Sequence, residues 1–290
     1  MNSKGLFYIS LLVMPLVILL CGICLAVAAQ NRHLPKATFP NFTRSAGDEA
    51  NLPGSYGLHL TPGLDRPKNA GAQRYDPGEP DLNMAVVRWE SNKMPLLIWI
   101  SPGLQLPDCP ASQLKNTRVD QVTEMLQLKE PFADLKQAIG WTPETNDDVA
   151  AGIEQWRQFQ GEGLFRFAFT DNPLDANICI FFVDAFREGS EAGGIMLGGN
   201  TAATVYPIAQ ARSIKIKQKP VIIELSTLVN STPQKMTGAA AHEFGHALGI
   251  KAHSPYREDI MYVDRVVDQL SAADKATIRW LYHQTPKYVL

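Results

Sequence analysis

Residues 242–253 decide the fold, and they read His242-Glu243-Phe244-Gly245-His246-Ala247-Leu248-Gly249-Ile250-Lys251-Ala252-His253. Two histidines four residues apart on a helix lie one turn apart on the same face, so the rings of His242 and His246 can converge on one metal ion. Glu243 points about 100° round the helix from His242, beside such an ion rather than onto it. The chain has six histidines, and three of them fall in this run, which argues against an incidental pattern on a surface helix.

His253 can reach the same ion only if the chain leaves the helix. On a continuing helix it would lie roughly 10 Å along the axis beyond His246, whereas zinc reaches only about 2 Å to each nitrogen. Gly249 allows the turn, because glycine tolerates the left-handed conformation of a helix C-cap. Three protein ligands leave a fourth position open for water, as in catalytic zinc sites. The run therefore predicts one catalytic Zn²⁺ bound by His242, His246 and His253, with Glu243 as the general base.

The flanking sequence predicts an α+β domain with one mixed sheet. Thr232 followed by Pro233 is a strong helix start, so the helix with the histidines should span 232–248. A last helix is predicted over 271–282, with Ser271 as its N-cap. The other predicted elements are a helix over 112–140 that breaks at Pro131, a helix after Asn146, and strands at 96–100, 164–170, 177–183, 204–206 and 221–225.

Residues 6–29 form an uncharged and almost wholly apolar run. The run is long enough to cross a bilayer as a helix, and it ends in Ala26-Val27-Ala28, which is shaped like a signal-peptidase site. A cleaved signal peptide within 1–29 and a retained transmembrane anchor are therefore both open, and a buried terminal helix is a weaker alternative. Either of the first two interpretations places the rest of the chain outside the cytoplasm, secreted or anchored to a membrane.

Residues 30–85 are rich in proline, glycine and charge, and they show no helical or strand period. This composition predicts a linker or an extended pro-segment, followed by a catalytic domain over 86–290. The net charge of −2 and the isoelectric point of about 6.3 give no electrostatic footprint for nucleic acid. Cys109 and Cys179 are the cysteines that follow the apolar run. In an oxidising compartment they could form a disulfide or stay separate thiols.

The histidine run resembles the metzincin clan of zinc peptidases, and it is most similar to the matrixin-type members, in which His-Glu-Phe-Gly-His-Ala-Leu-Gly is typical. Two later segments match in the same order. The segment 259–262, Asp-Ile-Met-Tyr, looks like the clan's Met-turn, which places Met261 under the metal site. The segment 270–274, Leu-Ser-Ala-Ala-Asp, looks like the start of the matrixin C-terminal helix. Over roughly 86–283 the resemblance implies a mixed twisted sheet with an active-site helix and a smaller C-terminal subdomain.

The resemblance also implies an activity, a zinc-dependent endopeptidase with a protein or peptide as substrate. In the clan, substrate pairs with the edge strand of the sheet by main-chain hydrogen bonds. The residues expected on that edge are Ala203, Thr204, Val205 and Tyr206. Tyr262 either walls the pocket for the side chain after the scissile bond or simply packs. Two other functions would use the same metal site: a zinc amidase acting on a cell-wall or other non-protein amide, and a non-catalytic zinc-containing binding module, which has no need of Glu243.

The chain departs from the clan pattern in the spacing of the third histidine. Gly249 and His253 are separated by one residue more than in the Gly-x-x-His of metzincins, a spacing that looks like a bacterial group of matrixin-type peptidases. Asp259 or Glu258 is the alternative third ligand. The sequence has no Pro-Arg-Cys-Gly cysteine switch, since Cys109 lies in Pro-Asp-Cys-Pro. The strand region has no histidine, so no structural zinc is implied.

Overall fold

The computed structural model describes residues 64–67, 71–109, 111–189, 195–197, 202–205, 210–211 and 220–290. The predicted signal peptide or anchor lies outside these residues. None of the helices among the described residues combines the length and the apolar character needed to cross a bilayer.

Helices and strands alternate along the described chain up to residue 226. Two helices then flank the segment that carries His253. The helices are α2 (Ala111–Met125), α3 (Pro143–Glu154), α4 (Gln158–Gly161), α5 (Pro233–Leu248) and α6 (Ala272–His283). The 3₁₀ turns are η1 (Pro80–Leu82), η2 (Ser91–Lys93), η3 (Gln155–Arg157) and η4 (Pro173–Asp175). The strands are β1 (Val87–Arg88), β2 (Leu96–Gln105), β3 (Lys136–Gln137), β4 (Phe167–Phe169), β5 (Ile178–Val183), β6 (Arg187–Gly189), β7 (Ile195–Leu197), β8 (Ala202–Val205), β9 (Gln210–Ala211), β10 (Val221–Ser226) and β11 (Tyr288–Val289).

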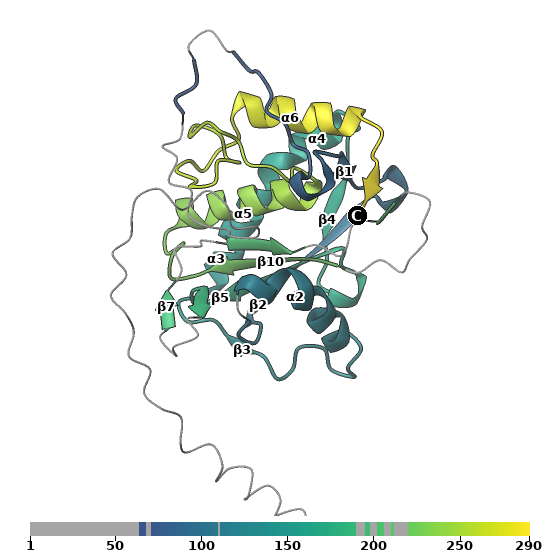
Figure 1. Ribbon diagram of the computed structural model, residues 1–290. Coiled ribbons are helices and arrows are strands. Elements are labelled where there is room, and N and C mark those ends of the chain that lie inside the picture. The colour runs from purple at the N-terminus through teal and green to yellow at the C-terminus, as the bar shows by residue number, and fades with distance from the viewer. Residues whose placement is uncertain are drawn as a thin grey trace, which may run out of the picture. The chain divides into compact units, whose positions relative to one another are not determined.

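The main sheet has six strands in the order β3-β2-β5-β10-β8, with β4 pairing on β2 (Figure 1). The pairs β2–β5, β5–β10 and β2–β4 are parallel, whereas β2–β3 and β10–β8 are antiparallel. The predicted mixed sheet in an α+β domain is therefore confirmed. Two small sheets, β1-β11-β9 and β6-β7, complete the described strands.

The central strands β5 and β10 are buried along their whole length, so both faces of the sheet are covered. Successive side chains of a strand point to opposite faces, which divides the core in two. The side chains that pack with α3 and α5 are Ile178, Ile180, Phe182, Ile223 and Leu225. Those that pack with α2 are Cys179, Phe181, Val183 and Ile222. Helix α5, with the histidine run, thus lies on one face of the sheet and α2 on the other.

The ends of α5 follow the predicted signals. The Thr232 hydroxyl accepts a hydrogen bond from Lys235 N (3.3 Å), and Pro233 occupies the first turn. At the other end Gly249 has φ of +117°, and a Cβ there would lie 2.4 Å from Val87 O, so only glycine fits. The last helical carbonyls also find donors, because Trp89 Nε1 donates to Ala247 O (2.7 Å) and the Tyr282 hydroxyl donates to Leu248 O (2.9 Å).

The predicted helix over 112–140 is wrong beyond Met125, where α2 ends. The chain instead brings Phe132 (φ +64°) onto the sheet. Its ring stacks on Trp99 at 5.3 Å between centroids and meets Phe181 edge-on at 5.2 Å. Such aromatic pairs contribute about 0.5–1.5 kcal/mol each beyond the buried area. Pro131, directly before Phe132, also disfavours a continuous helix, because proline has no N–H to donate and clashes with the preceding turn. Tertiary packing therefore overrides the approximate helical spacing.

The predicted end of the first strand at residue 100 is also wrong, because β2 runs on to Gln105. Its register with β5 shifts between Ile100 and Gln105, and Gly103 has φ of +78°. Proline and glycine are tolerated in strands at such irregularities. Ser101, Pro102 and Gly103 therefore lie within the strand, at this irregularity, and do not end it.

The described residues upstream of 86 pack on the same domain. Tyr75 is 6 % exposed and belongs to the main core. Its backbone N–H donates to Thr277 Oγ1 (3.2 Å) and its hydroxyl to Asp274 Oδ1 (2.8 Å), both on α6. The role of 30–85 as a linker or a pro-segment stays a prediction. Cys109 and Cys179 are not joined by a disulfide.

The close contact of α3 with α5 predicts a stability defect in Gly152→Ala. A Cβ at this position would lie 2.3 Å from Thr237 O and 2.9 Å from the Ala240 Cβ, so the two helices would have to separate. We expect a loss of about 1–3 kcal/mol in the free energy of unfolding, measured by urea denaturation. The matched control is Gly161→Ala, because nothing lies within 4 Å of that Cβ. Equal stability of the two variants would refute the packing.

Candidate metal centre

Three histidines meet at the C-terminal half of α5. His242 and His246 lie on the helix, and His253 lies on the segment that follows Gly249. Among the described residues these three form the group able to hold a metal ion, with ligand atoms all within 4.8 Å of one another. His246 Nε2 lies 3.2 Å from His253 Nε2. Two nitrogens on one tetrahedral zinc ion are about 3.3 Å apart when each bond is about 2.0–2.1 Å, so the spacing fits a shared ion.

The other ring nitrogens of the helical pair are engaged by the backbone. His242 Nδ1 lies 2.7 Å from Ile260 O, and His246 Nδ1 lies 2.6 Å from Ile250 O. A carbonyl oxygen only accepts hydrogen bonds, so in each ring Nδ1 carries the proton and the Nε2 lone pair is left to bind a metal. The orientation and the tautomer of both rings are therefore fixed for coordination through Nε2.

Burial also keeps these rings in the form that binds metal. It lowers the pKa of His242 to about 3 and holds the pKa of His246 well below its usual value, with the neighbouring histidines adding to both effects. Burial lowers the pKa of His253 in the same direction. Neutral imidazole is the metal ligand, whereas imidazolium has no lone pair to offer. The donor set therefore fits Zn²⁺ near neutral pH.

The longer spacing between Gly249 and His253 is absorbed by the loop. Lys251 N donates to Pro77 O (2.9 Å), and Ser254 N donates to Met261 O (2.8 Å). These bonds turn the chain back towards α5, so His253 reaches the other two histidines despite the additional residue.

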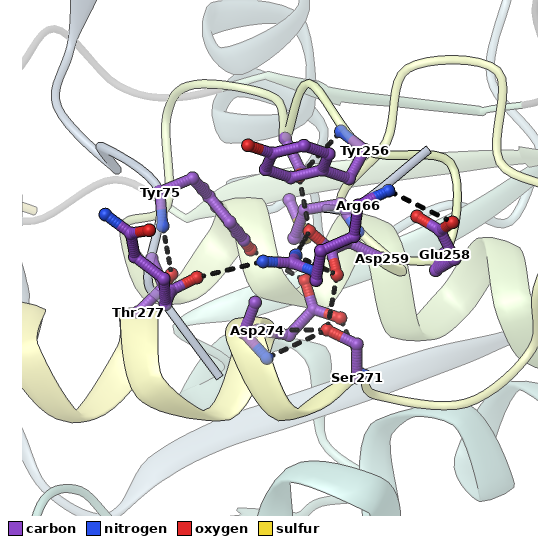
Figure 2. Close-up of polar contacts among 12 residues, drawn as sticks. Arg66, Tyr75, Tyr256, Glu258, Asp259, Ser271, Asp274 and Thr277 are labelled. Carbon is purple, nitrogen blue, oxygen red and sulfur yellow. Dashed lines mark hydrogen bonds and ion pairs between the residues drawn. The ribbon is translucent and has the colours of Figure 1, made fainter. Parts of the chain in front are cut away.

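The alternative ligands lie elsewhere. The Asp259 carboxylate is fully buried and accepts hydrogen bonds from Arg66, Ser254 and Ser271 (Figure 2). Glu258 Oε1 accepts from Arg66 N at 3.4 Å. The structure thus brings His253, rather than either acid, to the helical histidines. Its role as a zinc ligand stays a prediction.

Glu243 follows His242 on α5 and is buried, with 5 % of its surface exposed. Its charge acts on Arg265: burial lowers the pKa of this guanidinium, and the charges of Glu243 and Asp268 oppose that effect. Arg265 Nη2 also donates to Asn230 Oδ1 (3.3 Å). No sequence pattern points to Arg265, whose position depends on the fold of the segment after Met261.

Met261 lies against the helix between the two histidines. It is fully buried, and a Cβ at Gly245 would lie 2.5 Å from its Sδ. The turn that carries Met261 is stabilised by Asp274 of α6, whose carboxylate accepts hydrogen bonds from Ile260 N (2.8 Å) and Met261 N (3.4 Å). From the sequence, Asp274 is expected only at the start of the last helix. The same carboxylate also fixes the turn that carries Met261, which nothing local in the sequence reveals.

The residues predicted to bind substrate are partly described. β8 is the last strand on its side of the described sheet, and its residues Ala203, Thr204 and Val205 pair antiparallel with β10. Tyr206 lies outside the described residues. Tyr262 is 7 % exposed, and Tyr262 N donates to Asp259 O (3.2 Å). Contact of any of these residues with substrate stays a prediction.

A mixed sheet, a helix with two converging histidines, a third histidine after a glycine turn and a buried methionine below them define the metzincin class of metallopeptidase domain. The Matrixin family model matches residues 143–283, from the first residue of α3 to the last residue of α6. A comparison with curated proteins found no match. Residues 143–283 therefore form a matrixin-like metzincin domain, as the histidine run and the segments 259–262 and 270–274 predicted.

Proposed function

We propose that this protein is a zinc-dependent endopeptidase in which Glu243 is the general base. The observation that carries the proposal is the convergence of three histidines, whose ligand atoms all lie within 4.8 Å of one another. Two of them have Nδ1 bonded to backbone carbonyls, which leaves Nε2 free to bind a metal. The matrixin match supports a zinc-dependent peptidase in general, and the role of Glu243 is our inference from its position on α5.

Each residue of the site has a task in the proposed reaction. His242, His246 and His253 would hold the ion, and the hydrogen bonds to Ile260 O and Ile250 O keep two of the rings from rotating. When bound, zinc supplies Lewis-acid chemistry that acidifies water and polarises the scissile carbonyl. Glu243 accepts a proton from the attacking water and returns it to the nitrogen of the leaving amine.

We further propose that a peptide substrate binds along β8. As the last described strand on its side of the sheet, β8 can offer backbone groups to an extended peptide. Such pairing selects extended main chain and thus favours a protein substrate. We also infer that the catalytic domain works outside the cytoplasm, an inference that rests on residues 6–29 alone.

Metal removal tests the proposal. The full-length protein, purified in detergent because of its apolar residues 6–29, should contain one zinc per chain and cleave an unfolded protein substrate. A chelator should abolish cleavage, and added zinc should restore it. Zinc binding should also stabilise the fold by about 2.7 kcal/mol when free zinc exceeds its Kd 100-fold, which thermal unfolding with and without chelator would measure.

Three outcomes would contradict the proposal in different ways. Absence of zinc would reject the metal centre. Zinc without cleavage of proteins, but with hydrolysis of a cell-wall peptide amide, would point to an amidase. Zinc with no hydrolysis of either substrate would favour a binding module.

A further inference from the structure

A short segment far upstream of the family match lies along the loop that carries His253. Leu64 N donates to Pro255 O (3.1 Å), and Arg257 N donates to Leu64 O (3.4 Å). These bonds pair Leu64 with residues 255–257 in the manner of a parallel strand. The segment 64–67 therefore contacts the His253 loop directly.

Arg66 fixes this segment to a buried carboxylate (Figure 2). Its Nη2 donates to Asp259 Oδ1 (2.8 Å) and Oδ2 (2.6 Å), its Nη1 donates to Gln73 O (3.1 Å), and its Cζ lies 4.3 Å from the centroid of the Tyr256 ring. The Asp259 side chain is 0 % exposed and that of Arg66 is 17 % exposed. An ion pair this well shielded from water is screened far less than one on the surface.

Asp259 connects Arg66 to both ends of the loop. Ser254 Oγ and Ser271 Oγ both donate to its carboxylate. Ser254 directly follows His253, and Ser271 is the N-cap of α6. Ser254 N also donates to Met261 O (2.8 Å). The Asp259 carboxylate thus ties the residue next to His253 to the turn that carries Met261.

A second buried acid lies beside this carboxylate. Ser271 contacts both acids, since its hydroxyl donates to Asp259 Oδ1 (2.6 Å) and its N–H donates to Asp274 Oδ2 (2.8 Å). Removing one partner of a buried ion pair leaves a charge without compensation, a strongly unfavourable state. Without Arg66, Asp259 could relieve that charge by taking up a proton, which would alter its hydrogen bonds with Ser254 and Ser271, or by moving towards water. Such a movement would displace Ser254 and with it His253.

We propose that Arg66 is a positioning residue of the metal centre, which acts through Asp259 and Ser254 to keep His253 in place beside His242 and His246. The inference rests on the proposed function, since it takes the three histidines as zinc ligands. It adds that residues 64–67, although far upstream of the matrixin match, are required for a complete site.

The test compares Arg66→Met and Arg66→Lys in the full-length protein. Zinc affinity is measured by competition with a chromophoric chelator, and the Co²⁺-loaded protein is examined by visible absorption. We expect Arg66→Met to weaken zinc binding about 10–100-fold, as found for residues that orient metal ligands, and to alter the Co²⁺ spectrum. Arg66→Lys should lie in between, because lysine keeps the charge but cannot donate from a guanidinium plane.

The matched control is Arg279→Met. Arg279 also makes a two-pronged contact, with Glu162 (2.8 Å from both Nε and Nη2), but on the exposed side of α6. The Arg279→Met variant should bind zinc with the same affinity as the wild type. Wild-type zinc affinity in Arg66→Met, even with a lower melting temperature, would overturn the positioning role and leave the peptidase proposal intact. If Arg66→Met fails to fold, unchanged affinity in Arg66→Lys would overturn it. Wild-type protein that binds no zinc would instead reject the proposed function and this inference together.

Discussion

Replacing Glu243 by alanine should leave zinc bound and lower turnover by about 10²–10⁴-fold, the range typical of general acid–base catalysis. The expectation follows from the helix geometry. Glu243 is next to His242 but lies outside the group of residues able to hold the metal, so its removal should spare the ion. Zinc content and the rate of cleavage of an unfolded protein substrate, measured on the same preparation, would check both parts.

Glu243→Gln separates the proton transfer from packing. The amide has nearly the same shape as the carboxylate but cannot accept the proton, so its turnover should be as low as that of Glu243→Ala. Glu162→Ala serves as a control, because this acid pairs with Arg279 on the surface. Normal turnover in Glu243→Gln would reject the general base. Loss of zinc from either Glu243 variant would show that Glu243 supports the metal site itself.

The region from α5 to α6 could be predicted from the sequence because its signals are local. The hydroxyl cap at Thr232, the turn at Gly249 and the cap at Ser271 each act within a few residues, and the structure confirms all three. The prediction that the chain turns back at Gly249 rested on the reach of a metal ion, and the structure brings His253 to the helical histidines despite the longer spacing.

Other parts of the site could not be predicted because their contacts are distant along the chain. Arg66 meets Asp259 across 193 positions, and Tyr75 meets Asp274 across 199. Residues 30–85 have no hydrophobic period. Their described part is held in place by individual side chains and backbone hydrogen bonds, and not by the apolar face of a helix or strand. Periodicity detects amphipathic elements, so a segment packed in this way gives no signal of that kind.

The end of α2 shows the same limit inside the domain. The spacing of apolar residues over 112–140 approximates a helix, but α2 ends at Met125 and Phe132 packs on Trp99 and Phe181 instead. Local propensity is a weak guide where a large aromatic side chain can reach the sheet. The sequence thus predicted the elements more reliably than their ends.

Removing Arg118 should give the largest loss of stability among the changes considered. Its Nε and Nη2 donate to Glu224 Oε2 (2.7 Å) and Oε1 (2.9 Å), and the side chains are 3 % and 0 % exposed. Burial raises the pKa of Glu224, and Arg118 opposes that rise. In Arg118→Met the carboxylate would stay buried without its partner, at a cost of about 3–5 kcal/mol in the free energy of unfolding. Urea denaturation would measure the loss.

The double variant Arg118→Met/Glu224→Leu should recover most of that loss, because replacing both partners by apolar groups is often neutral or stabilising. Arg279→Met, which breaks an exposed pair, should cost less than about 1 kcal/mol. Glu224 lies on the α2 face of β10, since its neighbours Ile223 and Leu225 pack on the α5 face. Turnover per folded molecule should therefore match the wild type in all three variants. A drop in turnover for Arg118→Met at a temperature where it is folded would show that the two faces of the sheet are coupled.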